Sequence, residues 1–432
     1  MKKVICISPH FPPVNAADMH RLRQSLPYFQ EFGWEPIVFY ISPDNVEQAQ
    51  DPVLGNTVPD TVELHKVDAY PANITRKVSL GNLGFRCWFQ LKRAVDKYLA
   101  RNKCDLVYFS TTVFTVMSLG PHWLKKYGVP FVIDLQDPWR NDYYLSLPKS
   151  EQPNKFWFDY RQKKILEAYT MPKAAGIVSV SPGYVKTIKS RYPVLADMEC
   201  LTLPFAAFTQ DMEQAKLLHS RTILSEDTVE FLYIGRGGLD MEFSLSALFA
   251  ALRKGLDEKP AIFDKLRFTF IGTSYAPTGK GVLTILPIAV RHGVQDHVSE
   301  QTDRIPYYEA LNRLANTDYL LMPGSDDADY TASKIFPYIM AQTPLLAIFN
   351  KHSSVVDILA EANCEAVTFT KGQDFSQLFS AAYKRLEDML TMRSPIPSLA
   401  VLDKYSAERA TQLQCAYFER QINRISQKGL HH

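Results

Sequence analysis

In four segments of the sequence, a strand-like apolar run is followed directly by side chains that could do chemistry. In the first, the run 4–7 leads through the loop 8–18 into a helical pattern. Small residues in such a loop let the backbone approach a ligand, and the helix start that follows favours an anion. An ordinary strand–helix turn with Asp18 as its N-cap explains the same residues. Taken alone, this loop favours the ordinary turn.

The second segment places Asp134 and Asp137 at the exit of an apolar run and follows them with Trp139. In sugar sites an aromatic ring stacks on C–H faces while a carboxylate accepts hydrogen bonds from hydroxyl groups. Alternatively, the two aspartates cap the next turn and Trp139 belongs to the core. The sequence favours neither of these two interpretations over the other.

The third segment is a glycine-rich turn, residues 235–238, after the apolar run 229–234. Its spacing is not G-x-G-x-x-G, so a dinucleotide-binding fingerprint is not supported. Glycines leave backbone N–H groups available to phosphate oxygens, and Arg236 can hold a diphosphate through two parallel hydrogen bonds. The turn is compatible with a phosphate site without requiring one.

The fourth segment, residues 324–334, ends in Lys334 at the start of a predicted helix. A cation is unfavourable there unless an anion binds beside it, because the helix dipole favours negative charge at this end. We therefore expect an anion site at Lys334. Asp327 and Asp329 in the same loop could bind Mg²⁺, but loop acids are more often simply solvated, and we expect no metal.

The amino-acid composition excludes several classes of protein. The chain has 432 residues, 46% of them hydrophobic, with 48 Lys and Arg against 46 Asp and Glu. This balance argues against disorder and against nucleic-acid binding. The six cysteines are scattered without a C-x-x-C pair, which favours a reducing compartment over a zinc or disulfide framework. No stretch of 18 apolar residues occurs, and we expect a cytoplasmic protein.

The elements that must position these segments alternate between strands and helices. Predicted strands are 4–8, 36–41, 62–67, 105–110, 129–135, 176–180, 200–203, 229–234, 266–271, 318–322 and 345–349; predicted helices are 85–102, 113–127, 243–256, 281–291, 307–315, 334–341, 354–361 and 406–425. Such alternation with continuous apolar strands is typical of parallel sheets covered on both faces. We therefore predict an α/β protein with two Rossmann-like domains facing across a cleft, with the ligands at the carboxyl ends of the strands.

The domain boundary is expected where the charge changes sign. Residues 1–205 hold 25 Lys and Arg against 19 Asp and Glu, and the remainder holds 23 against 27. We expect an N-terminal domain over 1–205, a C-terminal domain over 206–405, and a helix over 406–432 that packs back on the N-terminal domain.

In order along the chain, these segments resemble the retaining glycosyltransferases of the GT-B fold, most closely family 4 (glycosyl transferases group 1). Residues 229–236 look like the strand and Gly-Arg that open their C-terminal domain. Residues 333–347 look like their Ser-Lys…Tyr-x-x-Ala-x-x-Pro signature, and 132–139 like their Asp-x-x-Asp-x-Trp stretch. The strand and serine at 177–181 also fit. The similarity covers nearly the whole chain, and the ordered set is more specific than any single motif.

The resemblance implies a metal-independent enzyme without a cofactor that transfers a sugar from a nucleotide-diphosphate sugar to a glycan or lipid-linked acceptor with retention, in surface polysaccharide or glycoconjugate biosynthesis. Three residues would be catalytic: Asp137, Arg236 and Lys334. The donor would contact Asn15, Ala16, Gly235, Arg236, Gly237, Asp329, Tyr330, Ser333 and Lys334. The acceptor would contact His10, Arg21, Asp137, Trp139 and Arg140.

The sequence also departs from the family pattern. Asp329 and Pro337 stand where the family has two glutamates, the second of which binds the donor ribose; Met241 and Glu242 stand where a lysine is usual; and the first loop lacks a Gly-Gly pair. These departures favour an alternative: a catalytically silent GT-B-like subunit that binds a sugar polymer or a partner.

A basic stretch could bring the protein to a membrane. Residues 74–103 carry eight Lys and Arg against one acid, Asp96, together with Trp88 and Phe89. Cations mixed with aromatics are typical of a helix that docks peripherally on the anionic inner face of a membrane. The aromatics fit the core face of an ordinary helix equally well.

Overall fold

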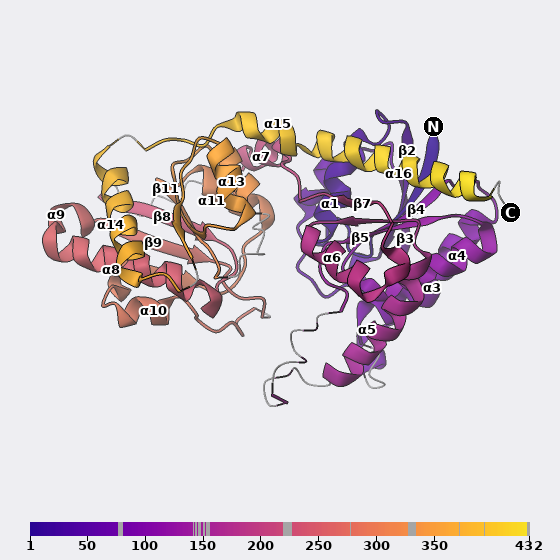
Figure 1. Cartoon of the computed structure of the whole chain (residues 1–432), viewed down its shortest axis with the longest axis horizontal. Coiled ribbons are helices and arrows are strands. Elements are labelled where there is room, and N and C mark those ends of the chain that lie inside the picture. Colours follow the sequence, from indigo (N-terminus) through magenta and orange to yellow (C-terminus); the bar gives the residue numbers. More distant parts are fainter. Residues whose placement is uncertain are drawn as a thin grey trace. The chain divides into compact units, whose positions relative to one another are not determined.

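The computed structural model describes residues 1–76, 81–140, 142, 145, 148–149, 152, 156–218, 227–276, 278–326, 334–370, 372–392 and 394–429. The chain divides into two compact units. Unit 1 comprises Met1–Ala206 and Ala407–His432, and unit 2 comprises Ala207–Ser406. Many of the elements of each unit are labelled in Figure 1.

The described strands of unit 1 form a seven-stranded parallel sheet in the order β3-β2-β1-β4-β5-β6-β7. Their bounds are β1 Lys2–Ile7, β2 Trp34–Ile41, β3 Glu63–Val67, β4 Leu106–Ser110, β5 Phe131–Leu135, β6 Gly176–Ser179 and β7 Cys200–Thr202. Every residue of β4, β5 and β6 is buried, as expected for strands covered on both faces. The strand order reverses between β1 and β4, which makes their carboxyl ends the topological switch point.

Helices cover both faces of this sheet (Figure 1). The α-helices are α1 Met19–Ser25, α2 Ala72–Thr75, α3 Leu83–Leu99, α4 Gly120–Tyr127, α5 Phe156–Thr170, α6 Pro182–Arg191 and α16 Ala407–Gly429. The 3₁₀ turns are η1 Leu26–Tyr28, η2 Pro43–Asn45, η3 Pro52–Thr57, η5 Phe114–Leu119, η7 Met171–Lys173 and η8 Pro193–Leu195. Capping residues fix the ends of helices α3 and α4. At the start of α3 the Asn82 side chain accepts a hydrogen bond from the backbone N–H of Gly84, and α4 ends at Gly128, whose φ is 70°.

Helix α16 completes the core of unit 1. Phe418 packs on Trp34 and Tyr108, with ring centroids 5.5 and 5.1 Å apart. The Tyr417 hydroxyl accepts from the backbone N–H of Ile177 and donates to the carbonyl of Glu199. The helix therefore belongs to the N-terminal sheet although it follows unit 2 in sequence.

The described strands of unit 2 form a six-stranded parallel sheet in the order β10-β9-β8-β11-β12-β13, with its reversal between β8 and β11. The strands are β8 Val229–Ile234, β9 Leu266–Ile271, β10 Val298–Gln301, β11 Tyr319–Pro323, β12 Leu345–Asn350 and β13 Val367–Phe369. The helices are α7 Thr209–Lys216, α8 Glu242–Glu258, α9 Pro260–Phe263, α10 Leu286–Arg291, α11 Tyr307–Ala315, α12 Ile335–Met340, α13 Ser354–Glu361, α14 Phe375–Thr391 and α15 Leu402–Tyr405, with 3₁₀ turns η9 Leu239–Met241, η10 Gln295–His297 and η11 Leu399–Val401.

The predicted α/β class with two Rossmann-like sheets is confirmed, and two predicted helices differ in detail. The helix expected over 113–127 is η5 followed by α4, because Pro121 in the first turn of α4 has no N–H to continue a helix from the preceding turn. The helix expected over 281–291 begins only at Leu286, next to Pro287. Strands β10 and β13 and helices α2, α5, α6, α7, α9, α14 and α15 were not predicted. None of the described helices is both long enough and apolar enough to cross a bilayer.

Candidate functional site

In unit 1 the switch point gathers side chains from three loops. His10 follows β1, Thr112 follows β4 and Asp137 follows β5. These strands are neighbours in the sheet, so their carboxyl ends form one edge.

His10 and Asp18 form a buried pair at this edge. Nδ1 of His10 lies 2.9 Å from Oδ1 of Asp18, whose other oxygen accepts from the Thr112 backbone N–H at 2.9 Å and from the Thr111 hydroxyl at 2.9 Å. Burial alone would raise the pKa of Asp18, but His10 and these donors lower it. The ionised Asp18 holds Nδ1 of His10, which leaves Nε2 for a ligand. That Nε2 has no hydrogen-bond partner within the described part of the chain. Asp18 does precede α1, but its carboxylate makes these contacts instead of capping the helix.

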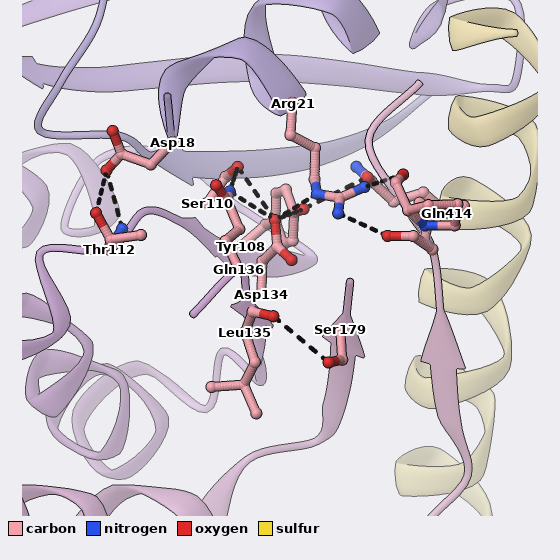
Figure 2. Close-up of polar contacts among 12 residues, drawn as sticks. Asp18, Arg21, Tyr108, Ser110, Thr112, Asp134, Leu135, Gln136, Ser179 and Gln414 are labelled. Atoms are coloured by element: carbon pink, nitrogen blue, oxygen red, sulfur yellow. Dashed lines mark hydrogen bonds and ion pairs between the residues drawn. The ribbon is translucent and has the colours of Figure 1, made fainter. Parts of the chain in front are cut away.

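Arg21 and Asp134 form a second buried pair (Figure 2). Nε of Arg21 lies 2.7 Å from Oδ2 of Asp134, and Arg21 also donates to the carbonyls of Leu203 and Pro204. Asp134 accepts further hydrogen bonds from Tyr108 at 3.1 Å and Gln136 at 2.8 Å. Burial raises the pKa of Asp134, against the opposing effect of Arg21. Because Arg21 is 4% exposed and its donors are used inside unit 1, we assign it a structural role and omit it from the acceptor contacts.

Asp137 stands at the mouth of a cavity. It is exposed, yet partial desolvation raises the pKa of its carboxyl, and the negative charge of Asp18 raises it further. Trp139 also lines the cavity, but it is 2% exposed and its ring stacks on Phe114 with centroids 5.6 Å apart. Trp139 is therefore a core residue that forms part of the wall. Arg140 pairs with two acidic side chains instead. Its Nε lies 3.3 Å from Oδ1 of Asp142 and 3.9 Å from Oε1 of Glu167.

Asn15 and Ala16 lie in the loop between β1 and α1. The backbone N–H of Asn15 donates to the Ala49 carbonyl at 2.8 Å, and Ala16 packs against the apolar core. Their contacts with a donor stay a prediction.

In unit 2 the switch point carries a group of cations. Arg236 follows β8, and Lys334 directly precedes α12. Burial and, to a smaller extent, the positive charges of Arg236 and Arg304 together lower the pKa of Lys334 to about 8. A pKa lowered by neighbouring cations indicates that the positive charges lie close together, which is the electrostatic environment that an anion stabilises.

Arg304 is a residue that sequence reasoning missed. It follows β10, and its guanidinium lies 4.2 Å from the centroid of the Tyr275 ring. The signal was weak because β10 reads Val-Ser-Glu-Gln, without the apolar run that marked the other strands.

The glycines beside Arg236 do something other than expected. The N–H of Gly235 donates to the Ile271 carbonyl and that of Gly237 to the Thr273 carbonyl, so neither is available to a phosphate. Instead, a Cβ on Gly235 would collide with Nζ of Lys334 and the hydroxyl of Tyr233. Gly235 thus makes room for the lysine, while Arg236 binds Asp240 through two hydrogen bonds of 3.0 and 2.6 Å.

Other predicted donor residues lie outside the described residues, namely Asp329, Tyr330 and Ser333, as does Asp327. Within the described ranges, no three His, Cys, Asp or Glu side chains gather as metal ligands would. All six cysteines are unpaired.

No family model and no curated protein matches the chain. Solved structures match it over its whole length. Sucrose-phosphate synthase from Thermosynechococcus elongatus is 12% identical with a TM-score of 0.55, over 100% of this chain and 99% of that one. The UDP-forming α,α-trehalose-phosphate synthase from Burkholderia xenovorans, solved with glucose-6-phosphate, is 9% identical with a TM-score of 0.59. The match covers 97% of this chain and 100% of that one. HepE from Anabaena, solved with UDP-glucose, is 12% identical with a TM-score of 0.53, and the match covers 99% of this chain and 100% of that one. The chain therefore has the GT-B fold.

Proposed function

We propose that the protein is a glycosyltransferase that moves a sugar from a nucleotide-diphosphate sugar to a glycan or lipid-linked acceptor with retention, in the biosynthesis of surface polysaccharide or another glycoconjugate. The observation that carries this proposal is the group of cations Arg236, Lys334 and Arg304 at the switch point of unit 2. The fold supports it, because each solved structure named above is a sugar-phosphate synthase or binds UDP-glucose.

The cations would act on the leaving group. Negative charge builds up on the diphosphate as the bond to the sugar breaks, and fixed positive groups in a dry site stabilise it without a metal or cofactor. Lys334 and Arg304 supply this charge, and Arg236 shares its own with Asp240. Retention follows if the departing phosphate takes the proton of the acceptor on the same face of the sugar.

Unit 1 would hold the acceptor. Asp137 lies at the cavity mouth, where its carboxylate can accept hydrogen bonds from hydroxyl groups. His10 contributes Nε2 as a hydrogen-bonding group, held in orientation by Asp18.

Peripheral docking on an anionic membrane is part of the proposal. Two of the cations of α3 are engaged within the protein. Arg86 is 3% exposed and donates to the carbonyls of Tyr70 and Asn45, so it faces inward. Asp96 pairs with Lys92. Exposed cations remain at Arg93 and Lys97, beside Phe89, which is 65% exposed. Lys77 lies outside the described residues.

Helix α5 adds a second surface that a membrane could contact. Trp157, Ile165 and Tyr169 are 68%, 59% and 47% exposed, and Arg161 and Lys164 are exposed on the same helix. Aromatic and aliphatic side chains mixed with cations favour the interface of an anionic bilayer.

The test is a thermal-shift screen of UDP, GDP, ADP and their common sugar conjugates, followed by donor hydrolysis with any conjugate that binds. We expect stabilisation by one nucleotide family, loss of that stabilisation in Lys334→Ala, and slow hydrolysis of the donor. Binding without hydrolysis or transfer to any acceptor would instead favour the catalytically silent subunit suggested by Pro337 and Met241. Binding of none of the nucleotides would contradict the proposal.

A further inference from the structure

The cavity beside Asp137 has a volume of about 360 Å³ and lies wholly within unit 1. Its walls come from the start of α3, from η5 and from α5. The rings of Phe85 and Phe114 provide flat apolar surface, and the amides of Asn82 and Gln162 provide hydrogen-bonding groups. This volume lies in the range of small-molecule sites.

The charges around the cavity are unusual for a phosphate-binding pocket. Lys163 is the one cation among the described residues that line it, and its Nζ lies 2.8 Å from Oδ2 of Asp159. Asp137 has no cation paired with it among the described residues. With Asp137 and Asp159 counted as −1 each and Lys163 as +1, the described residues that line the cavity have a formal charge of −1.

This arrangement is the reverse of that in unit 2. There Nζ of Lys334 lies against Gly235, directly before Arg236, and burial together with the charges of Arg236 and Arg304 lowers the pKa of the lysine to about 8. A phosphate would gain charge-assisted hydrogen bonds in unit 2, whereas in the unit 1 cavity it would meet Asp137 and displace Asp159 from Lys163. The two units therefore offer binding sites of opposite charge preference.

We infer that the cavity in unit 1 binds the acceptor, and that this acceptor is a carbohydrate that carries neither phosphate nor carboxylate. Rings such as Phe85 and Phe114 can stack on the C–H faces of a sugar, and the carboxylate of Asp137 and the amide of Gln162 suit its hydroxyl groups. The inference rests on the proposed function in that it names the acceptor class of the same reaction. It also separates this protein from the trehalose-phosphate synthase of similar fold that was solved with glucose-6-phosphate.

Saturation-transfer NMR on the full chain tests the inference without requiring turnover. The probes are glucose, galactose, mannose, N-acetylglucosamine and maltose, each of the monosaccharides being paired with its 6-phosphate. We expect at least one neutral sugar to bind, its 6-phosphate to bind at least tenfold more weakly, and Asp137→Asn to weaken the neutral sugar at least fivefold. Gln162→Lys, which adds a second cation to the wall, should strengthen binding of the 6-phosphate at least fivefold. Ala168→Lys, on the exposed side of the same helix, should leave it unchanged.

Equal or tighter binding of the 6-phosphates, sensitive to Gln162→Lys, would overturn the inference. So would the absence of any neutral sugar whose binding responds to Asp137→Asn. Binding of UDP, GDP and ADP, measured in the same samples and with Lys334→Ala, reports separately on the proposed function. Nucleotide binding with no neutral sugar bound contradicts the acceptor inference alone, and sugar binding with none of the three nucleotides bound contradicts the glycosyltransferase proposal.

Discussion

Nε of Arg21 lies 2.7 Å from Oδ2 of Asp134, and these side chains are 3% and 0% exposed. The arginine comes from α1 and the aspartate from the end of β5, so the pair joins the first helix to the middle of the sheet. Removing one partner leaves an uncompensated buried charge. Arg21→Ala should therefore lower the free energy of unfolding by about 3–5 kcal/mol, measured by urea denaturation. The double replacement Arg21→Met with Asp134→Leu should cost less than Arg21→Ala. A single variant as stable as the wild type would contradict this account of the pair.

Lys334 and Arg236 should matter for turnover more than for stability. A charge-assisted hydrogen bond contributes about 1.5–3 kcal/mol, so Lys334→Ala and Arg236→Ala should each reduce the transfer rate at least tenfold. Arg253→Ala is the matched control, because Arg253 is an arginine of unit 2 whose side chain is 43% exposed and pairs with Asp257 on α8. Wild-type rates in both Lys334→Ala and Arg236→Ala would rule out these residues as the diphosphate site.

Nucleotide binding should weaken as the pH rises through the pKa of Lys334, which is about 8 in the folded protein. Below that pH the amine is charged and attracts the diphosphate; above it the charge is lost. UDP affinity measured by calorimetry should fall between pH 7 and pH 9 in the wild type, and fall less in Lys334→Arg, where the cation does not titrate. The comparison cancels any titration of the nucleotide. Identical pH profiles for the two proteins would contradict the prediction.

The same shift has a consequence for stability. Lys334 has a pKa of about 8 when folded against an ordinary value of 10.5, so between these values the unfolded chain binds more protons. The contribution of this group to stability should rise with pH across that interval. Urea midpoints at pH 8 and pH 10, compared with those of Lys334→Met, should show a larger relative gain for the wild type.

Transfer activity should survive excess EDTA if the cations of unit 2 replace a metal. Rates before and after chelation, and after Mg²⁺ or Mn²⁺ is added back, check this. Activity lost to EDTA and restored by either ion would move the leaving-group assignment to Asp327 and Asp329.

Membrane docking should depend on charge. Co-sedimentation with phosphatidylglycerol vesicles should be strong at low salt and weak at high salt, because each Lys or Arg near an anionic surface contributes about 1 kcal/mol. Replacing Arg93 and Lys97 on α3 with Glu should reduce binding, and replacing Arg161 and Lys164 on α5 should do the same. Binding absent at low salt, or unchanged by both pairs of replacements, would count against docking.

Much of the architecture was predictable because most strands are continuous apolar runs. Val229–Ile234 and Leu345–Asn350 are examples, and both fall within a residue of the predicted bounds. The rule that ligands bind at the carboxyl ends of parallel strands then directed attention to Asp137, Arg236 and Lys334. Pattern and topology together assigned each of these residues to a loop at the carboxyl end of a strand, and their roles stay a prediction.

What the sequence could not predict depends on distant partners. Asp18 looks like a helix cap, but its carboxylate accepts from Thr112, 94 residues away. Gly235 looks like a phosphate-binding glycine, yet its N–H completes the pairing with Ile271, and its missing side chain leaves room for Lys334. Arg304 follows a mostly polar strand that is recognised only through its register with β9. No local pattern carries such information.

The contribution of α16 to unit 1 makes that unit discontinuous in the chain. As the protein is synthesised, Trp34 and Tyr108 leave the ribosome long before Phe418, because all of Ala207–Ser406 is made in between. Unit 2 is contiguous and can fold as soon as it emerges. Leu22, Leu26 and Phe29 already cover part of that apolar face, and the rest stays exposed until the helix arrives, so the nascent N-terminal unit is the natural client for a chaperone during that interval.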